Sequence, residues 1–273
     1  MKSTERFSTR VEAYREHRPR YPREVVDLLR ECGLTSQTVI GDVAAGTGLL
    51  AEIFLENGNP LIAVEPNAAM RAVCEELEAD YPKLTCVNGT AEATGLADGS
   101  VDMVTVGQAM HWFDLEKTRA EFARILSPRH AKTARRGPRI PGPGGWCVVV
   151  YNHRKMGGDA FHEGYERILV EFGRDYHMVQ GSHLTDDKLA GFFAPSEMKC
   201  ATLPNHQELT LEGLQGRILS SSYMPQAGDG KYAAMMEAIG DLFARYAKDG
   251  VVRMEYETAV CYGVLSPKQA KNA

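Results

Sequence analysis

Residues 42–48, Asp42-Val43-Ala44-Ala45-Gly46-Thr47-Gly48, closely follow the apolar segment 38–40 of this 273-residue chain. Together they predict a β-strand that ends in a glycine turn and opens a helix. Glycine allows a tight turn and a close approach to a ligand, and the start of a helix offers N–H groups to that ligand. A second apolar run, 61–64, is closed by Glu65, whose carboxylate suits a ribose diol. The pattern indicates a nucleoside-binding Rossmann-type unit.

Strands and helices alternate along the first half of the chain, which predicts a parallel sheet covered on both faces. The expected strands are 38–43, 61–65, 84–87, 101–106 and 146–151, and the expected helices are 22–32, 48–57, 67–79 and 115–126. The second half departs from this rhythm. It predicts a helix at 161–172, an irregular segment at 174–195, a strand at 197–203, helices at 211–219 and 232–247, and a long final strand at 251–265.

Composition and charge narrow the function classes. The formal net charge of −5 argues against a general nucleic-acid binder, which usually carries a basic face. No apolar run approaches the roughly 20 residues that span a bilayer, and the N-terminus lacks the apolar core of a secretion signal. The six cysteines are scattered without a C-x-x-C pair, so we expect buried, reduced thiols and a cytoplasmic protein. Residues 129–143 are basic and rich in proline, which predicts a flexible surface loop.

The identity of the nucleoside depends on acidic and polar residues at the strand ends. The spacing Gly46-x-Gly48-x-x-Ala51 formally fits a dinucleotide site, which is a weak signal alone. Asp42 argues against that reading, because its carboxylate would repel a pyrophosphate and suits the ammonium group of an amino acid. Residues 89–92 follow the third strand, where they can contact an adenine. Residues 107–113 place polar and aromatic side chains at the carboxyl edge of the sheet, where ligands bind.

At these positions the chain resembles class I S-adenosylmethionine-dependent methyltransferases, in particular the small-molecule type 11 group that includes enzymes similar to trans-aconitate methyltransferase. The matching stretches are 7–22, 42–48, 64–67, 89–92, 108–113, and 126–128 joined to 144–146. The resemblance implies an α/β fold with a doubly wound, mostly parallel seven-stranded sheet, an antiparallel last strand and a helical lid. The insertion 129–143 departs from the family pattern.

The resemblance also implies roles for individual residues. S-adenosylmethionine would be bound by Asp42, Ala44, Gly46, Thr47, Gly48, Glu65, Pro66, Met70, Thr90, Ala91, Glu92 and Gln108. Substrate residues would be Tyr14, Arg18, Tyr21, His111, Trp112 and Tyr223, and the catalytic candidates are His111 and Gln108. His111 is either a general base or a residue that orders its loop. A carboxylate acceptor, which stays one option, needs no base and would need an arginine clamp from Arg10, Arg18 or Arg154.

The expected organisation is a single methyltransferase domain over 1–273. It comprises an N-terminal lid and first helix (1–32), a cofactor-binding core (36–155) that contains the basic loop (129–143), a substrate cap (156–225), and a last helix and closing strand (226–265). We expect a small-molecule substrate, a monomer or dimer, and no metal, membrane or nucleic-acid partner. Two alternatives stay open: a nicotinamide-dependent oxidoreductase and a non-catalytic nucleoside-binding protein.

Overall fold

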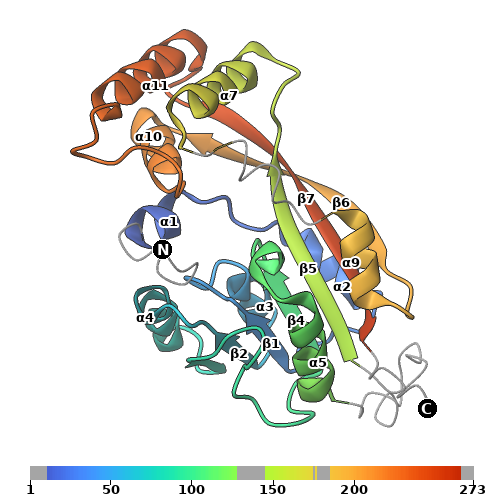
Figure 1. The fold of residues 1–273 in the computed structure, drawn as a ribbon. Coiled ribbons are helices and arrows are strands. Elements are labelled where there is room, and N and C mark those ends of the chain that lie inside the picture. The colour runs from blue at the N-terminus through green and yellow to red at the C-terminus, as the bar shows by residue number, and fades with distance from the viewer. Residues whose placement is uncertain (1–10, 128–144, 175, 177–184, 266–273) are drawn as a thin grey trace. The chain divides into compact units, whose positions relative to one another are not determined.

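A seven-stranded sheet with the order β3-β2-β1-β4-β5-β7-β6 organises the computed structural model, which describes residues 11–127, 145–174, 176 and 185–265 (Figure 1). The strands are β1 (Ile40–Val43), β2 (Leu61–Val64), β3 (Leu84–Val87), β4 (Met103–Gly107), β5 (Gly145–Arg154), β6 (Lys199–Leu209) and β7 (Val252–Leu265). β1 pairs in parallel with β2 and β4, and the parallel ladder continues to β3 and β5. The last strands are antiparallel, so the predicted mixed, Rossmann-like sheet is confirmed.

The described helices are α1 (Val11–His17), α2 (Glu24–Arg30), α3 (Ala51–Glu56), α4 (Ala68–Glu76), α5 (Leu115–Ile125), α7 (Ala160–Phe172), α9 (Asp186–Phe193), α10 (Leu211–Leu219) and α11 (Tyr232–Tyr246), with short 3-10 turns η2 (Leu77–Ala79) and η3 (Met110–Trp112). Seven of the described helices match predicted ones, with ends that differ by a few residues, whereas α1 and α9 were not among the expected helices. The Asn67 side chain accepts hydrogen bonds from the backbone N–H groups of Ala69 and Met70, so it is the N-cap of α4 that the sequence predicts. Within the described ranges, no helix has the length and apolarity to cross a bilayer.

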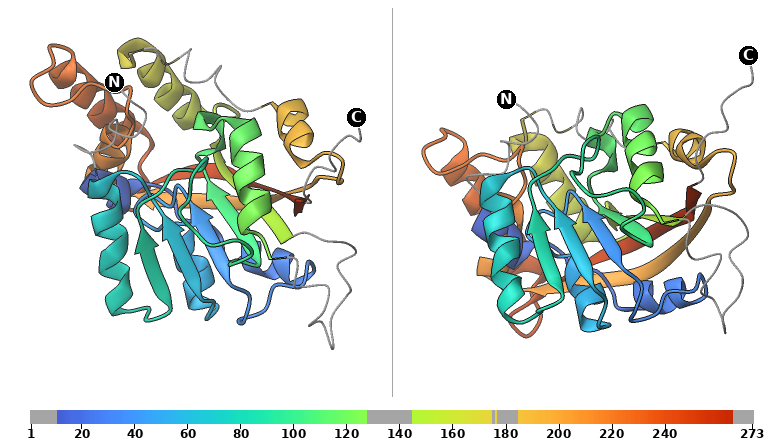
Figure 2. Two further views of the ribbon diagram at one scale, coloured as in Figure 1. Left: turned by 60° about the horizontal axis from the view of Figure 1, so that its bottom comes forward. Right: turned by 90° about the horizontal axis from the view of Figure 1, so that it is seen from below.

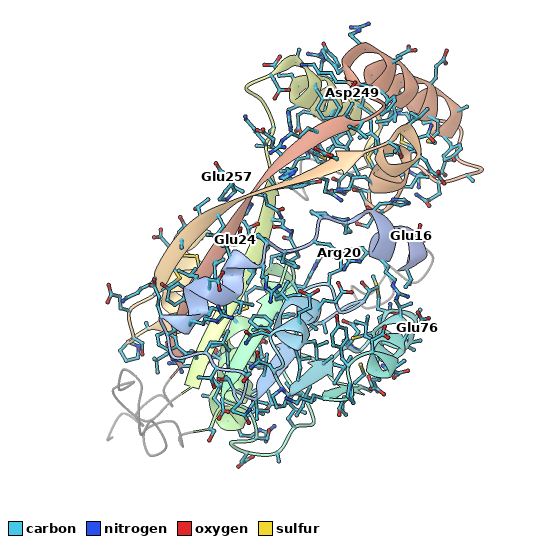
Figure 3. The ribbon with its side chains drawn as sticks, turned by 180° about the vertical axis from the view of Figure 1, so that it is seen from behind. Glu16, Arg20, Glu24, Glu76, Asp249 and Glu257 are labelled. Atoms are coloured by element: carbon cyan, nitrogen blue, oxygen red, sulfur yellow. A yellow bond between two sulfur atoms is a disulfide. The ribbon has the colours of Figure 1, made fainter. Side chains whose placement is uncertain are left out.

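The described residues fall into two compact units. Unit 1 takes in residues 11–20, 152–174, 176 and 204–258, and unit 2 takes in residues 21–127, 145–151, 185–203 and 259–265. In Figure 3, Glu16 and Asp249 mark unit 1, whereas Glu24 and Glu76 mark unit 2. The segment boundaries expected for a single domain stay a prediction, and the basic loop 129–143, Phe7 and Arg10 lie outside the described residues.

Helices cover both faces of the sheet in unit 2. Figures 1 and 2 show α5 and α9 on one face and α2 and α3 on the other. Phe122 of α5 and Phe192 of α9 meet edge to face, with ring centroids 6.1 Å apart, over the buried side chains of β4 and β5. The buried Arg119 fastens the end of α9, because its guanidinium donates to the carbonyls of Phe192 and Ala194, both at 2.9 Å.

α9 corrects the sequence prediction, which made 174–195 irregular. The helix starts at an N-cap, since the Thr185 side chain accepts from the N–H of Lys188, and it buries Leu189, Phe192 and Phe193. β6 is also longer than the predicted strand 197–203. It continues through Pro204, which an edge strand tolerates because its outward side needs no ladder donor.

The cysteine prediction is wrong for two of the six residues. Cys200 of β6 and Cys261 of β7 form a disulfide. The other four are free thiols, of which Cys32, Cys74 and Cys147 are buried as expected. The prediction missed the pairing because the two residues are 61 positions apart and no spacing rule joins them.

Candidate functional site

The turn from β1 into α3 has an unusual backbone. Ala44, Gly46 and Gly48 adopt positive φ angles of 56°, 60° and 88°. A Cβ at Gly48 would lie 2.6 Å from Leu77 Cδ1 and 3.1 Å from Cys74 Sγ, so this glycine packs tightly against α4 and η2. A Cβ at Gly46 would meet no atom within 4 Å. The turn is therefore closed on the side of α4 and open at Gly46, where a ligand can approach the backbone.

Asp42 lies at the end of β1 and is fully buried. Its Oδ1 atom accepts a hydrogen bond of 2.6 Å from the Thr105 hydroxyl on β4, whereas Oδ2 has no hydrogen-bond partner among the described residues. Burial raises the pKa of Asp42 to about 7; the bond from Thr105 opposes this shift and the nearby charge of Glu65 adds to it. A buried carboxylate with one unsatisfied oxygen suits a cationic ligand group.

Glu65, at the end of β2, holds the glycine turn against the start of α4. Its Oε2 atom accepts from the N–H of Gly46 at 2.9 Å, and its Oε1 atom accepts from the N–H of Asn67 at 2.8 Å. Burial raises the pKa of Glu65, and the two backbone donors act against that shift. Each carboxylate oxygen can accept more than one hydrogen bond. The two amides thus fix the orientation of the carboxylate and leave it able to accept from a diol.

The remaining predicted cofactor residues surround the ends of β2 and β3. Pro66 links β2 to the Asn67 cap, and Met70 is buried on α4. Thr90 pairs with Ala93 in a tight turn that buries Ala91. The Glu92 carboxylate accepts from the N–H of Asp114 at 3.0 Å, which ties this turn to the N-terminus of α5. Thr47 lies in the glycine turn, and its buried hydroxyl has no partner within the described part of the chain.

The carboxyl end of β4 carries the catalytic candidates. Gln108 has a positive φ of 57°, and its N–H donates to the carbonyl of Val150 on β5. The hydroxyl of Tyr151 lies 3.2 Å from Nδ1 of His111 and accepts from its backbone N–H at 3.3 Å. Burial raises the pKa of Tyr151 to about 12, so this hydroxyl is neutral. The His111 ring also contacts Trp112, at 4.6 Å between centroids, and Trp112 is 40% exposed.

Tyr21 belongs to the same region of unit 2. A Cβ at Gly107 would lie 2.7 Å from the Tyr21 hydroxyl, so the missing side chain at Gly107 makes room for this tyrosine. The other predicted substrate residues, Tyr14, Arg18 and Tyr223, belong to unit 1. There the Arg18 guanidinium stacks 4.9 Å above the Tyr14 ring and donates to the Ser220 carbonyl.

Sequence reasoning missed Thr105, Tyr151 and the left-handed backbone at Ala44 and Gln108. Thr105 had a signal, because it is the polar residue in the otherwise apolar run 103–106 and buried polar groups need partners. Tyr151 had none, because it closes a continuous apolar strand. Among the described residues, no group of His, Cys, Asp and Glu side chains is arranged to hold a metal ion.

Part of the chain matches a known protein family. The family model "Methyltransferase domain" matches residues 41–130. An uncharacterized methyltransferase of Mycobacterium tuberculosis is 40% identical over 122 residues, which are 45% of this chain and 48% of that protein. The chain thus spans about half the length of the curated relatives it matches.

Solved structures establish the fold over nearly the whole chain. A putative type II methyltransferase from Anaeromyxobacter dehalogenans matches with a TM-score of 0.61 and 20% identity over 92% of this chain and 99% of that one. A phosphoethanolamine N-methyltransferase of Haemonchus contortus in complex with S-adenosyl-L-methionine matches with a TM-score of 0.55 and 15% identity, over 97% and 59% of the two chains. The fold of this chain is the Rossmann-like fold of class I methyltransferases.

Proposed function

Starting from the class I methyltransferase fold and the methyltransferase-domain match over residues 41–130, we propose that this protein transfers a methyl group from S-adenosylmethionine to a small-molecule acceptor. The observation that carries the proposal is the buried Asp42, which lies beside the open glycine turn and whose Oδ2 atom has no hydrogen-bond partner among the described residues. S-adenosylmethionine has the ammonium group that this carboxylate requires. The named methyltransferase relatives and the cofactor present in the Haemonchus complex support the same choice.

The residues fit the cofactor as follows. Asp42 receives the ammonium group of the methionine moiety, and the backbone of 44–48, including Ala44, Thr47 and Gly48, approaches its carboxylate. Glu65, oriented by two amides, accepts from the ribose hydroxyls. The adenine lies against the side chains and backbone that follow β2 and β3, namely Pro66, Met70, Thr90, Ala91 and Glu92. When bound, the cofactor supplies a methyl group that its sulfonium has already activated.

The remaining task of the protein is alignment and exclusion of water. Gln108 and His111, at the end of β4, orient the acceptor, together with Tyr21 and Trp112. Tyr151 positions the His111 ring through its contact with Nδ1. An acceptor that arrives protonated requires His111 to take the proton. A carboxylate acceptor, which we favour because the chain resembles enzymes similar to trans-aconitate methyltransferase, requires no base.

The alternatives fit the site less well. A nicotinamide dinucleotide would place its diphosphate near the Asp42 carboxylate, where like charges repel. A non-catalytic nucleoside-binding protein would need no ordered polar cluster at the end of β4. The proposal includes four further points. The protein is related to enzymes similar to trans-aconitate methyltransferase, it is cytoplasmic, it is a monomer or dimer, and it has no nucleic-acid partner.

Calorimetry tests which cofactor the protein binds. We expect heat of binding with S-adenosylmethionine and S-adenosylhomocysteine and none with NAD+. Asp42→Asn should weaken binding about 10- to 100-fold, the range for a hydrogen bond to a charged group. The matched control Asp98→Asn, at an exposed carboxylate in the same unit, should bind like the wild type. Binding of NAD+ instead, or no binding of either adenosyl ligand, overturns the proposal.

A metabolite screen tests the reaction. The protein is incubated with S-adenosylmethionine and a metabolite extract, and mass spectrometry follows the gain of one methyl group and the formation of S-adenosylhomocysteine. We expect a methylated small acid. Cofactor binding without turnover in any pool would favour the non-catalytic alternative.

A further inference from the structure

Two arginines of unit 1, Arg18 and Arg217, converge on one turn of the chain. Arg18 follows α1 and donates from Nη2 to the Ser220 carbonyl at 3.0 Å. Arg217, on α10, donates from Nη1 to the Ser221 hydroxyl at 3.3 Å. The helices that carry them pack closely, because a Cβ at Gly216 would lie only 2.0 Å from the His17 ring. The fold therefore brings two guanidinium groups, 199 residues apart in sequence, to the same place.

Neither guanidinium forms an ion pair within the described residues. Arg217 is 8% exposed, and its Nε atom donates to the Tyr256 hydroxyl at 3.1 Å. That hydroxyl donates in turn to Gln207, so it is a neutral partner. Arg18 stacks on the Tyr14 ring, and its buried Nε atom has no acceptor in the part of the chain that the structure describes. Burial and the nearby charge of Arg217 both lower the pKa of Arg18. The two cations repel each other, and none of the acidic side chains that the structure describes pairs with them.

Arg154, in the same unit, shows what a structural arginine looks like here. Its guanidinium pairs with the Glu166 carboxylate and lies 5.0 Å above the Tyr165 ring. The Glu166 carboxylate also accepts from the Tyr176 hydroxyl. Unit 1 thus provides a counter-ion where an arginine serves packing alone. By contrast, no described carboxylate pairs with Arg18 or Arg217, which leaves these two guanidinium groups able to receive an anion.

We propose that Arg18 and Arg217 bind a small carboxylate ligand within unit 1, with the Tyr165 hydroxyl as a further donor. Tyr165 is 1% exposed, its hydroxyl has no partner in the described part of the chain, and a phenol donates readily to a carboxylate. Guanidinium groups match the planar carboxylate through paired N–H donors. This anion site is built from unit 1 alone and does not depend on the proposed methyl transfer.

The test measures anion binding without cofactor. Acetate, succinate and inorganic phosphate are titrated into the full chain at one ionic strength, with calorimetric detection. We expect succinate to bind and to bind more tightly than phosphate. Arg217→Gln and Arg18→Gln should each weaken succinate binding about 10- to 100-fold. Arg217→Lys, which keeps the charge and loses the fork, should weaken it less. Arg245→Gln, at an exposed position of α11, is the control and should bind like the wild type.

The outcomes separate this inference from the proposed function. Absence of carboxylate binding, or binding that neither arginine variant weakens, overturns the inference even where S-adenosylmethionine binds. Tighter binding of phosphate that depends on Arg217 overturns the choice of carboxylate. Failure to bind S-adenosylmethionine with succinate binding intact overturns the proposed function alone. If Arg217→Gln does not fold, Arg18→Gln and Arg217→Lys give the same decision.

Discussion

The two units of this protein each bury a pair of like charges, and the pairs have opposite signs. In unit 2 the carboxylates Asp42 and Glu65 lie at the ends of neighbouring strands, and the charge of Glu65 adds to the raised pKa of Asp42. In unit 1 the guanidinium groups of Arg18 and Arg217 lie together, and the charge of Arg217 adds to the lowered pKa of Arg18. Burial shifts both carboxylates and Arg18 toward their neutral forms, whereas nearby tyrosines, chiefly Tyr256, outweigh burial and raise the pKa of Arg217.

The difference between the pairs teaches where a ligand of each charge belongs. A buried charge without a counter-ion destabilises a fold, so it persists where it serves binding. Asp42 of the acidic pair suits the cationic end of an aminoacyl group, and the basic pair suits an anion. The two units thus differ in the sign of the ligand charge that each can receive.

The largest expected effect concerns Asp42 and pH. Its pKa rises from an ordinary value of 3.8 to about 7 in the folded protein, a change that corresponds to about 4 kcal/mol. The folded state therefore holds this proton more tightly than the unfolded state, so the contribution is present below pH 3.8 and is lost as pH rises through about 7. In urea unfolding from pH 4 to 8, the wild type should lose stability relative to Asp42→Asn. Parallel pH profiles for the two proteins would contradict this expectation.

The next effect compares a paired with an unpaired arginine. Glu166→Gln leaves the Arg154 guanidinium, whose side chain is 11% exposed, without its counter-ion, and should lower the free energy of unfolding by about 2–4 kcal/mol. The double variant with Arg154→Met should recover part of that loss. Arg217→Met should cost less than Glu166→Gln in anion-free buffer, because it also relieves repulsion from Arg18. Urea denaturation at low salt measures all three, and a larger loss for Arg217→Met would break the comparison.

The third prediction concerns the contribution of Glu65 to the affinity for S-adenosylmethionine. Glu65→Gln removes the charge and one of the two acceptor oxygens that the amides of Gly46 and Asn67 orient. The affinity for S-adenosylmethionine should fall by about 1.5–3 kcal/mol. Calorimetry measures the change, with Glu75→Gln, at an exposed carboxylate on α4, as the control. Equal affinities for Glu65→Gln and wild type would exclude a contact with the ribose.

The smallest effect concerns the position of His111. Tyr151→Phe removes the hydroxyl that contacts both the His111 backbone and its ring. We expect the activation free energy of turnover to rise by about 0.5–1.5 kcal/mol. The kcat for the acceptor found in the metabolite screen should fall, and the Kd for S-adenosylmethionine should not change. A change in Kd without a change in kcat would show that Tyr151 acts on the cofactor site.

The acidic pair, Asp42 and Glu65, was predictable from the sequence, but the pairing of Arg18 with Arg217 was not. Asp42 and Glu65 close two buried parallel strands, which are continuous apolar runs, so both the strands and the edge where their ends meet follow from pattern. Arg18 was expected to contact substrate through the family resemblance. Arg217 carried no signal, because a lone cation in a short amphipathic helix is ordinary. Its neighbours, the cation Arg18 and the hydrogen-bond acceptor Tyr256, come from distant segments that only the folded chain brings together.

The predicted ends of helices and strands were wrong where local sequence signals conflict with tertiary packing. The α9 segment has a helix cap and apolar spacing, but they lie within polar, glycine-containing sequence that favours loops. The predicted strand 197–203 stops just before Pro204, whereas β6 continues through it. A proline interrupts the hydrogen bonding of a central strand but is tolerated in an edge strand. The disulfide followed from neither propensity nor spacing.

The cross-link between Cys200 and Cys261 has a consequence for handling the protein. β6 is the last strand in the sheet order, and such strands offer unpaired backbone groups to other molecules. A covalent bond to β7 keeps this strand from peeling away and recruiting a second copy. Reducing agents, a routine additive for proteins with free thiols, are therefore expected to hasten aggregation here, and purification without them should yield the longer-lived sample.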